Sequence, residues 1–287
     1  MRLRDAALLI LLGMAWGAVY PLTTLALRGF SPAAVVAGRT ALSAVILVPL
    51  AVRTGLFQAV RERPAALAAG AVLQATLPVT LLTFGQQHVA SGIAGIILAS
   101  QPVWAAVMTG VLDLAGRIRE LTGVAVGLGG IALLSWPGGG AAAESAWGLA
   151  ALIAAALSYA AGAVYIQRVI PETPPVVAAS SAMTLTAMVL LPIAAVTWDH
   201  TPGWASTGWL TGLAVATGPA LVLYYTLIHR TGPVRATLAG YLAPGFALLG
   251  SAFLGQRLTL REIAGLALVL AGSYVAARDS IRTARHA

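Results

Sequence analysis

The chain of 287 residues contains neither cysteine nor lysine, and only 9% of its residues are charged. The lack of cysteine excludes disulfide bonds and thiolate chemistry. Soluble domains carry about 25% charged residues, so this low charge content, with 59% hydrophobic residues, indicates a membrane protein. The formal net charge of +8 comes entirely from arginines, which lie between apolar runs and not on one soluble face. This placement argues against nucleic acid as a partner and favours a lipid bilayer.

About 20 consecutive apolar residues cross the hydrocarbon core of a membrane. The first run is too long for the 7–15-residue apolar region of a signal peptide, so we expect an uncleaved first span. No soluble domain fits between the runs, and a loose segment at 137–145 divides the chain near its middle. The sequence predicts ten spans, at residues 6–27, 32–52, 65–86, 92–112, 120–136, 147–167, 174–197, 205–228, 233–254 and 261–277.

The distribution of arginine supports ten spans. Thirteen of the seventeen arginines fall on the side of the N-terminus, three fall on the opposite side, and Arg39 lies inside a span. Because positively charged loops stay in the cytoplasm, we expect both termini to be cytoplasmic.

The chain repeats itself with an offset of 142 residues, which places Leu98–Ala132 on Gly240–Tyr274. We interpret the chain as two diverged copies of one unit, residues 1–140 and 141–287. Each copy has five spans, an odd number, so the second copy is predicted to be inverted. Two inverted units can exchange conformations around a site at the membrane midplane, as in alternating-access transporters. The matched residues include Pro102 with Pro244, Arg119-Glu120 with Arg261-Glu262, and Gly17-Ala18-Val19-Tyr20 with Gly162-Ala163-Val164-Tyr165.

The chain resembles the EamA family of the drug/metabolite transporter superfamily. The resemblance rests on Ala15-Trp16-Gly17, on Gly38-Arg39, and on the spans that contain Pro102 and Pro244. It implies an all-α polytopic protein of the bacterial inner membrane that exports small amphiphilic metabolites such as amino acids. Within the family, the chain resembles the aromatic amino acid exporter branch. The second copy departs from symmetry, because Ser181 or Ala182 stands where an equivalent of Arg39 would lie.

Arg39 is the most informative single residue. It lies seven positions into a span, about 10 Å deep at 1.5 Å per residue, and intramembrane charges usually face the interior of a bundle. One hypothesis is that its guanidinium binds a carboxylate of the substrate in bidentate fashion. The alternative is that it extends outward to the interface or holds carbonyl groups of a neighbouring helix.

Other polar and aromatic residues at midplane depth are candidates for the cavity wall, although helix packing explains any one of them equally well. Aromatic rings can stack on a planar substrate. Prolines inside spans remove a backbone hydrogen bond and are candidate hinges, with a static kink as the alternative. The candidates for substrate contact are Arg39, Trp16, Tyr20, Gln74, Thr80, Gln101, Tyr159, Tyr165, Tyr224, Tyr225 and Tyr241, and the candidate hinges are Pro78, Pro102, Pro219 and Pro244.

Small residues on the fifth and tenth spans predict close helix packing, and the chain is expected to be a monomer or a weak homodimer. A membrane-embedded enzyme acting on a lipid is the rival class. It requires a catalytic group at membrane depth, such as an HExxH motif or a pair of aspartates, and the sequence has neither. We therefore expect no enzymatic activity, no metal and no cofactor. All nine acids lie at span ends or in loops, which favours facilitated diffusion or coupling through the substrate over a carboxylate proton relay.

Overall fold

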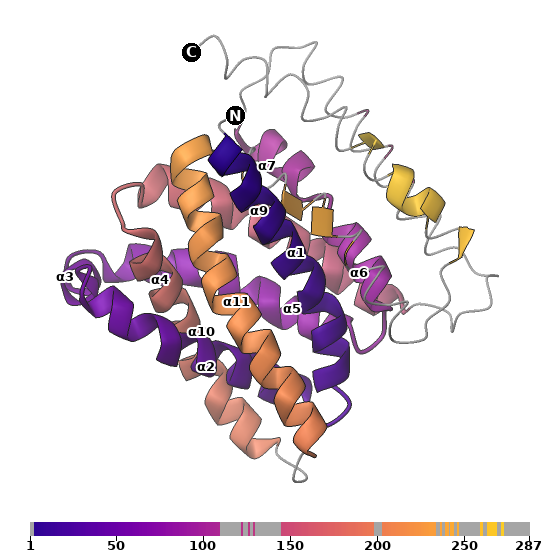
Figure 1. Cartoon of the computed structure of the whole chain (residues 1–287), viewed down its shortest axis with the longest axis horizontal. Coiled ribbons are helices and arrows are strands. Elements are labelled where there is room, and N and C mark those ends of the chain that lie inside the picture. The colour runs from indigo at the N-terminus through magenta and orange to yellow at the C-terminus, as the bar shows by residue number, and fades with distance from the viewer. Residues whose placement is uncertain are drawn as a thin grey trace.

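The computed structural model describes residues 3–109, 145–197 and 203–233 continuously, together with short pieces between residues 122 and 272. Within these residues every regular element is helical, in agreement with the predicted all-α class. Figure 1 shows the helices as one bundle. The elements are α1 (Leu3–Ala26), α2 (Pro32–Val52), α3 (Leu56–Glu62), α4 (Pro64–Ala71), the π-helix η1 (Val72–Thr76), α5 (Leu77–Gly85), α6 (Ser91–Leu98), α7 (Gln101–Thr109), α9 (Ala146–Val169), α10 (Pro175–Val196) and α11 (Trp204–Thr231).

Six helical segments in the described part are long and apolar enough to cross a membrane. They confirm six of the predicted spans, and the part of the predicted run 92–112 that the structure describes, up to Thr109, forms the two shorter helices α6 and α7. The runs 120–136, 233–254 and 261–277 lie mostly outside the described residues, so the count of ten stays a prediction. The six segments are Ala7–Ala26, Pro32–Val52, Pro64–Gly85, Ala146–Val169, Pro175–Val196 and Trp204–Thr231.

Proline and glycine set several of the helix boundaries. The helices α2, α4 and α10 each carry proline at the first helical position, where its fixed φ is favourable and its missing N–H is not needed. Ser31 caps α2, because its hydroxyl accepts a hydrogen bond from the Ala34 N–H at 3.3 Å. The helix α11 ends before Gly232, which has a φ of +82°.

The helices pack in long pairs: α10 lies along α2, α1 along α11, and α9 along α5. The first turn of α2 meets the last turn of α10, because the Ser31 and Thr197 hydroxyls are 3.4 Å apart. Likewise the end of α5 meets the start of α9, where Gly85 and Gly148 allow the backbones to approach closely. These contacts make α2 antiparallel to α10 and α5 antiparallel to α9.

The helix α1 ends on the same face as α5, since Gln86, after α5, donates a hydrogen bond to the Tyr20 carbonyl near the end of α1. The helices α1 and α9 therefore also run in opposite directions. An inverted repeat requires this arrangement of the first spans of the two halves, α1 and α9, and of the second spans, α2 and α10.

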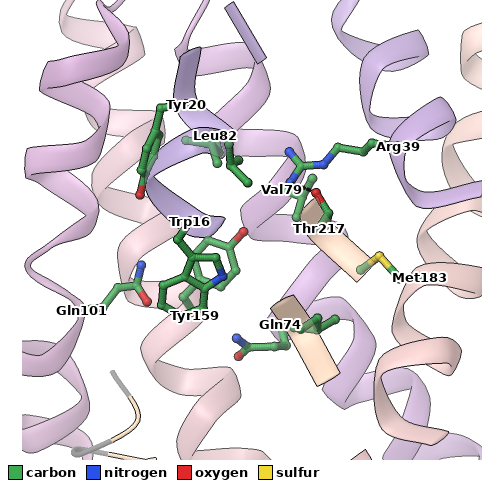
Figure 2. Close-up of a pocket in the computed structure, with 12 residues that line it drawn as sticks. Trp16, Tyr20, Arg39, Gln74, Val79, Leu82, Gln101, Tyr159, Met183 and Thr217 are labelled. Atoms are coloured by element: carbon green, nitrogen blue, oxygen red, sulfur yellow. Dashed lines mark hydrogen bonds between the residues drawn. The ribbon is translucent and has the colours of Figure 1, made fainter. Parts of the chain in front are cut away.

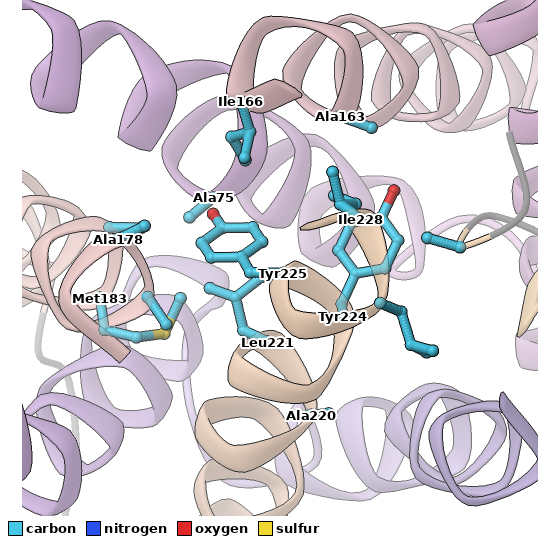
Figure 3. Packing of buried hydrophobic residues seen from close by; sticks show 14 of the residues in the cluster. Ala75, Ala163, Ile166, Ala178, Met183, Ala220, Leu221, Tyr224, Tyr225 and Ile228 are labelled. Atoms are coloured by element: carbon cyan, nitrogen blue, oxygen red, sulfur yellow. The ribbon is translucent and has the colours of Figure 1, made fainter. Parts of the chain in front are cut away.

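A buried apolar cluster fills the space between α1, α2, α4, α9, α10 and α11. Figure 3 shows its centre, where Tyr225, Met183 and Ile166 pack between helices of both halves. The cluster also contains buried alanines such as Ala163 of α9 and Ala178 of α10. Small residues are enriched at such helix contacts in membranes, where packing is the main attraction.

Candidate functional site

A cavity of about 50 Å³ lies where the helices of the two halves meet. Its wall combines one charged side chain with polar, aromatic and aliphatic ones (Figure 2). The lining residues are Trp16, Val19 and Tyr20 of α1, Arg39 of α2, Gln74 of η1, Val79 and Leu82 of α5, Gln101 of α7, Tyr159 of α9, Met183 of α10, and Thr217 and Leu221 of α11.

Arg39 is the single charged residue among the described residues that line the cavity. It is only 2% exposed, so it does not extend to the membrane surface. One guanidinium nitrogen, Nη2, donates a 2.8 Å hydrogen bond to Thr217 Oγ1. The Thr217 hydroxyl itself donates to the Leu213 carbonyl at 2.7 Å, which leaves its oxygen free to accept from Arg39.

The other two guanidinium nitrogens, Nε and Nη1, are buried and have no hydrogen-bond partner. Unsatisfied buried donors are destabilising by roughly 1–3 kcal/mol each, and by more when charged. The positively charged guanidinium group of Arg39 therefore has unused N–H donors, and the planar geometry of a guanidinium matches that of a carboxylate.

Gln74 reaches the cavity from the π-helical segment. Here the Leu77 N–H bonds to the Val72 carbonyl, five residues back, so the Leu73 carbonyl loses its usual partner. Ser158 of α9 replaces that partner with a 2.8 Å hydrogen bond to Leu73 O. Pro78 has no N–H to donate to the Gln74 carbonyl, and this explains why the regular helix is interrupted here. Single π-helical turns often mark functional sites.

The glutamine side chain is held against α9. A Cβ atom at Gly162 would collide with the carboxamide oxygen of Gln74 and lie 3.1 Å from its Cα. The lack of a side chain at Gly162 therefore makes room for Gln74. Gln74 is 1% exposed, and neither its Oε1 nor its Nε2 makes a hydrogen bond of good geometry, although its side chain lies within reach of the Tyr224 hydroxyl.

Gln101 enters the cavity from the interrupted span of α6 and α7. The helix α6 ends at Leu98, and a turn at Ala99–Ser100 separates it from Gln101, the first residue of α7. Pro102, the next residue, has no N–H for the Leu98 carbonyl, so a continuous helix would leave that bond unmade. Ser100 stabilises the turn, as its hydroxyl donates to Ile97 O at 2.7 Å and accepts from Trp104 Nε1 at 3.1 Å.

Aromatic side chains cover much of the remaining wall. The Trp16 ring lies near Tyr159, and Tyr20 lies on the same side of the cavity (Figure 2). Trp16 also packs against Tyr224, with ring centroids 4.8 Å apart and planes tilted by 59°, and such tilted pairs are favourable.

Six of the eleven residues predicted for substrate contact line the cavity: Trp16, Tyr20, Arg39, Gln74, Gln101 and Tyr159. Four do not line it: Thr80 is half-buried on α5, Tyr165 packs beside Gly70, and Tyr224 and Tyr225 lie within the apolar cluster of Figure 3. The eleventh, Tyr241, is outside the described residues.

The four predicted hinge prolines differ in their surroundings. Pro102 follows the break between α6 and α7, and Pro78 follows the π-helical segment. Pro219 lies inside the continuous helix α11 and is exposed on its outer side. Pro244 is outside the described residues.

Sequence reasoning missed half of the wall. Thr217 is the most important of these residues because it holds Arg39, but a threonine within an apolar span carries no signal that distinguishes it from a packing residue. The other missed residues are Val19, Val79, Leu82, Met183 and Leu221.

The cavity is small in this conformation. Sites for small molecules typically measure about 300–1,000 Å³, whereas this space of about 50 Å³ is sufficient for a few waters. A metabolite would require the surrounding helices to separate.

Membrane-length helices around a polar cavity between two sets of spans are typical of membrane transport proteins. The chain belongs to the EamA-like transporter family, whose profile matches residues 4–136 and again residues 146–278.

Several relatives carry transporter names. The inner membrane transporter YedA of Escherichia coli K12 is 30% identical over 191 residues, which cover 63% of this chain and 60% of YedA. The transporter YvbV of Bacillus subtilis is 26% identical, covering 93% of this chain and 89% of the relative. A protein of Streptantibioticus cattleyicolor named as a probable terminal-alkyne amino-acid exporter is 27% identical, covering 87% and 94%.

The fold is also found in a solved crystal structure that aligns with a TM-score of 0.70 at 17% identity. The alignment covers 96% of this chain and 98% of that one. At this identity the similarity establishes the fold alone.

Proposed function

We propose that this protein exports small amphiphilic metabolites, amino acids in particular, by alternating access through the cavity around Arg39. In this proposal the chain forms ten spans in two inverted five-span units, residues 1–140 and 141–287. Both termini are cytoplasmic, and the protein resides in the inner membrane.

The observation that carries the proposal is the state of Arg39. A buried guanidinium with two unpartnered nitrogens and one threonine contact is complementary to an anion. The described residues of the wall include no aspartate or glutamate that could neutralise it. The carboxylate of a metabolite supplies both the charge and the paired acceptor oxygens that the guanidinium lacks.

The rest of the wall favours a substrate with an apolar body. Trp16, Tyr20 and Tyr159 offer ring faces, and Met183 and Leu221 offer aliphatic surface. A cationic side chain would meet Arg39 without any described acid to balance it, so lysine and arginine are expected to be poor substrates. The amino-acid exporter among the relatives supports the same substrate class and the direction of export.

Alternating access is supported by the geometry of the two halves. Helices of both halves line the cavity, and the equivalent pairs α1/α9 and α2/α10 are antiparallel. In this proposal the small cavity corresponds to an intermediate between an inward-open and an outward-open state. The helical hydrogen-bond pattern is interrupted at the α6–α7 turn and at η1, and the wall of the cavity can bend at these two positions.

Transport assays with the purified protein in proteoliposomes test this function. We expect flux of neutral amino acids, with the highest rates among apolar and aromatic ones, and little flux of lysine. Arg39→Lys should reduce kcat/KM by about 10–100-fold, because a charged hydrogen-bonding pair contributes roughly 1.5–3 kcal/mol and an ammonium cannot form the bidentate pair. Arg28→Lys, at an exposed arginine between α1 and α2, is the matched control and should leave flux unchanged. Full activity of Arg39→Lys, or no flux of any amino acid under any gradient, would contradict the proposal.

A further inference from the structure

We infer that Gln74 and Gln101 form a second subsite in the cavity, which accepts hydrogen bonds from the ammonium group of an α-amino acid. This inference rests on the proposed function and makes it more specific. Such a subsite would distinguish amino acids from simple carboxylic acids of the same size, which Arg39 alone would bind equally well.

The unpartnered atoms of the wall fall into two chemical types. Those of Arg39 are donors, and they require an acceptor such as a carboxylate. At Gln74 and Gln101 the carboxamide oxygens, Oε1, are buried acceptors with no partner, and Gln74 also has one unpartnered donor, Nε2. Buried polar groups almost always have a hydrogen-bond partner, so a ligand in the cavity is expected to supply a hydrogen-bond donor to these oxygens. The anion of a simple carboxylic acid has no such donor.

The two glutamines lie apart from Arg39 within the same cavity. Figure 2 shows Arg39 beside Thr217, and it shows Gln74 and Gln101 at two further positions on either side of the Trp16 ring. A molecule that carries a carboxylate and an ammonium can therefore direct the first group to Arg39 and the second to the glutamines.

The local backbone fixes the glutamines in these positions. Gln74 belongs to the π-helical turn, which Ser158 stabilises through Leu73, and Gly162 provides the space for its carboxamide. Gln101 begins α7 directly after the α6–α7 turn. Both irregularities turn a polar side chain toward the cavity at a point where the backbone hydrogen-bond pattern is interrupted.

Neutral carboxamides suit this task better than carboxylates do. An ammonium group has three donors, which carboxamide oxygens and the faces of nearby aromatic rings can accept. A carboxylate in their place would pair with Arg39 and remove the charge that selects the substrate's own carboxylate.

The test compares each amino acid with its des-amino analogue. We would measure the binding of L-phenylalanine against 3-phenylpropanoate, and of L-leucine against 4-methylpentanoate, by calorimetry on the protein in detergent. The wild-type protein should bind the amino acid of each pair at least about tenfold more tightly, equivalent to about 1.4 kcal/mol. Gln101→Leu and Gln74→Leu should each remove most of this preference by weakening the amino acid and leaving the analogue within about twofold.

Gln86→Leu is the matched control. Gln86 is also a buried glutamine with an unpartnered Oε1, but its Nε2 bonds to the Tyr20 carbonyl and it does not line the cavity, so its loss should leave the preference unchanged. Gly162→Ala provides a second test that keeps the glutamine. Its new Cβ displaces the Gln74 carboxamide and should lower the preference in the same direction.

The possible failures are distinguishable. Equal binding of an amino acid and its analogue to the wild-type protein would overturn the ammonium subsite and leave the carboxylate role of Arg39 intact. Equal weakening of both molecules in Gln101→Leu and Gln74→Leu would show that the glutamines act only in packing, which also overturns the inference. Failure of the wild-type protein to bind any of the four molecules would overturn the proposed function and this inference with it.

Discussion

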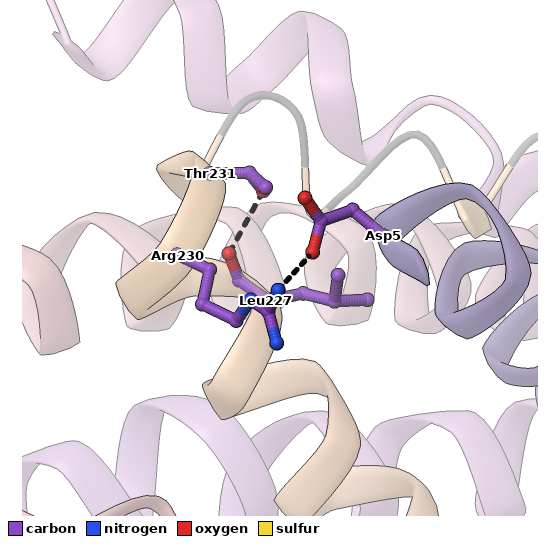
Figure 4. Close-up of polar contacts among 4 residues, drawn as sticks. All are labelled: Asp5, Leu227, Arg230 and Thr231. Atoms are coloured by element: carbon purple, nitrogen blue, oxygen red, sulfur yellow. Dashed lines mark hydrogen bonds and ion pairs between the residues drawn. The ribbon is translucent and has the colours of Figure 1, made fainter. Parts of the chain in front are cut away.

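Asp5 and Arg230 form an ion pair that joins the first turn of α1 to the last turn of α11, with 2.8 Å between Asp5 Oδ1 and Arg230 Nη2 (Figure 4). The carboxylate lies at a helix N-terminus and the guanidinium at a helix C-terminus, so each charge is also favourable toward its own helix dipole. The two partners are unequally buried, since the Asp5 side chain is 10% exposed and the Arg230 side chain 42% exposed. This ion pair lies at one end of the contact between α1 and α11, two helices that line the cavity.

Removing the two partners should therefore have unequal effects. Arg230→Gln leaves the buried Asp5 carboxylate without its counter-charge and should destabilise the protein by roughly 1–3 kcal/mol. Asp5→Asn leaves only a half-exposed arginine, and a loss of about 0–1 kcal/mol is expected because solvent screens the remaining charge. Thermal unfolding in detergent, followed by tryptophan fluorescence, measures both changes. The double variant should resemble Asp5→Asn.

Arg53→Gln is the control for the loss of an arginine charge near a helix end, because Arg53 is exposed after α2. It should leave the melting temperature unchanged. Equal and additive losses in Asp5→Asn and Arg230→Gln would show that the two residues act independently and that the ion pair contributes nothing.

Gly17 and Gly38 both lie at helix contacts, but they face different neighbours. A Cβ atom at Gly17 would collide with the Phe246 side chain and lie 2.9 Å from the Ala243 carbonyl, and backbone cannot move away easily. We expect Gly17→Ala to destabilise by about 1–3 kcal/mol through overpacking. At Gly38 the new Cβ meets only the side chain of Leu210, which can rotate, so Gly38→Ala should be milder.

Gly208→Ala is the matched control in this series. Gly208 is an exposed residue of α11, and a Cβ atom added there would meet nothing within 4 Å, so alanine should stabilise the helix by up to about 1 kcal/mol. Melting temperatures should follow the order Gly208→Ala, wild type, Gly38→Ala, Gly17→Ala, from highest to lowest. A melting temperature for Gly17→Ala equal to that of the wild type would mean that the α1 contact is looser than the structure indicates.

Much of the fold was predictable because hydropathy and proline act locally. The six confirmed spans are long apolar runs, and several of them begin at a proline that starts the helix in the structure. The burial of Arg39 was also foreseeable, because a charge that far from either end of a span is expected to face the interior.

The features that the sequence did not predict depend on contacts between distant segments. The π-helical turn at Val72–Thr76 is stabilised from α9 by Ser158, and no local pattern indicates that partner. The short helix α3 was also missed, since its seven residues are too few for a periodic signal. Tyr224 and Tyr225 show the opposite error in reasoning: tyrosines at midplane depth suggested the cavity wall, whereas they pack in the apolar cluster behind it.

The prolines at the two helix irregularities should affect turnover more than affinity. Pro102→Ala restores an N–H that can reach the Leu98 carbonyl and favours a continuous helix across the α6–α7 turn. Pro78→Ala does the same beside the π-helical turn. Both variants are expected to lower the transport rate several-fold and to change substrate affinity by less than about twofold. Parallel measurements of equilibrium binding and of flux in proteoliposomes separate the two quantities.

Pro219→Ala is the control for this experiment. Pro219 lies in the unbroken helix α11 with an outward-facing side chain, and its replacement should leave both the rate and the affinity close to wild type. Unchanged turnover in both Pro102→Ala and Pro78→Ala would show that these breaks are static kinks, and the hinge proposal would fail.

The membrane orientation can be measured directly because the chain has no native cysteine. The predicted topology puts the α3 segment and the loop between α9 and α10 in the cytoplasm, and the ends of α5 and of α10 outside. Single cysteines at Gln58 and Glu172 report on the first two positions, and cysteines at Gln87 and Gly203 report on the other two; all four residues are exposed. In intact spheroplasts a membrane-impermeant maleimide should label Gln87→Cys and Gly203→Cys, and should label Gln58→Cys and Glu172→Cys only after the membrane is opened.

The two halves contribute one position to each face, so labelling tests their relative orientation as well as the side of the membrane. If all four labels were exchanged, the halves would remain inverted and the arginine count would have assigned the wrong face. Labelling of Gln58→Cys together with Gly203→Cys, and of neither other variant, would instead show that the spans of the two halves are not arranged as an inverted pair.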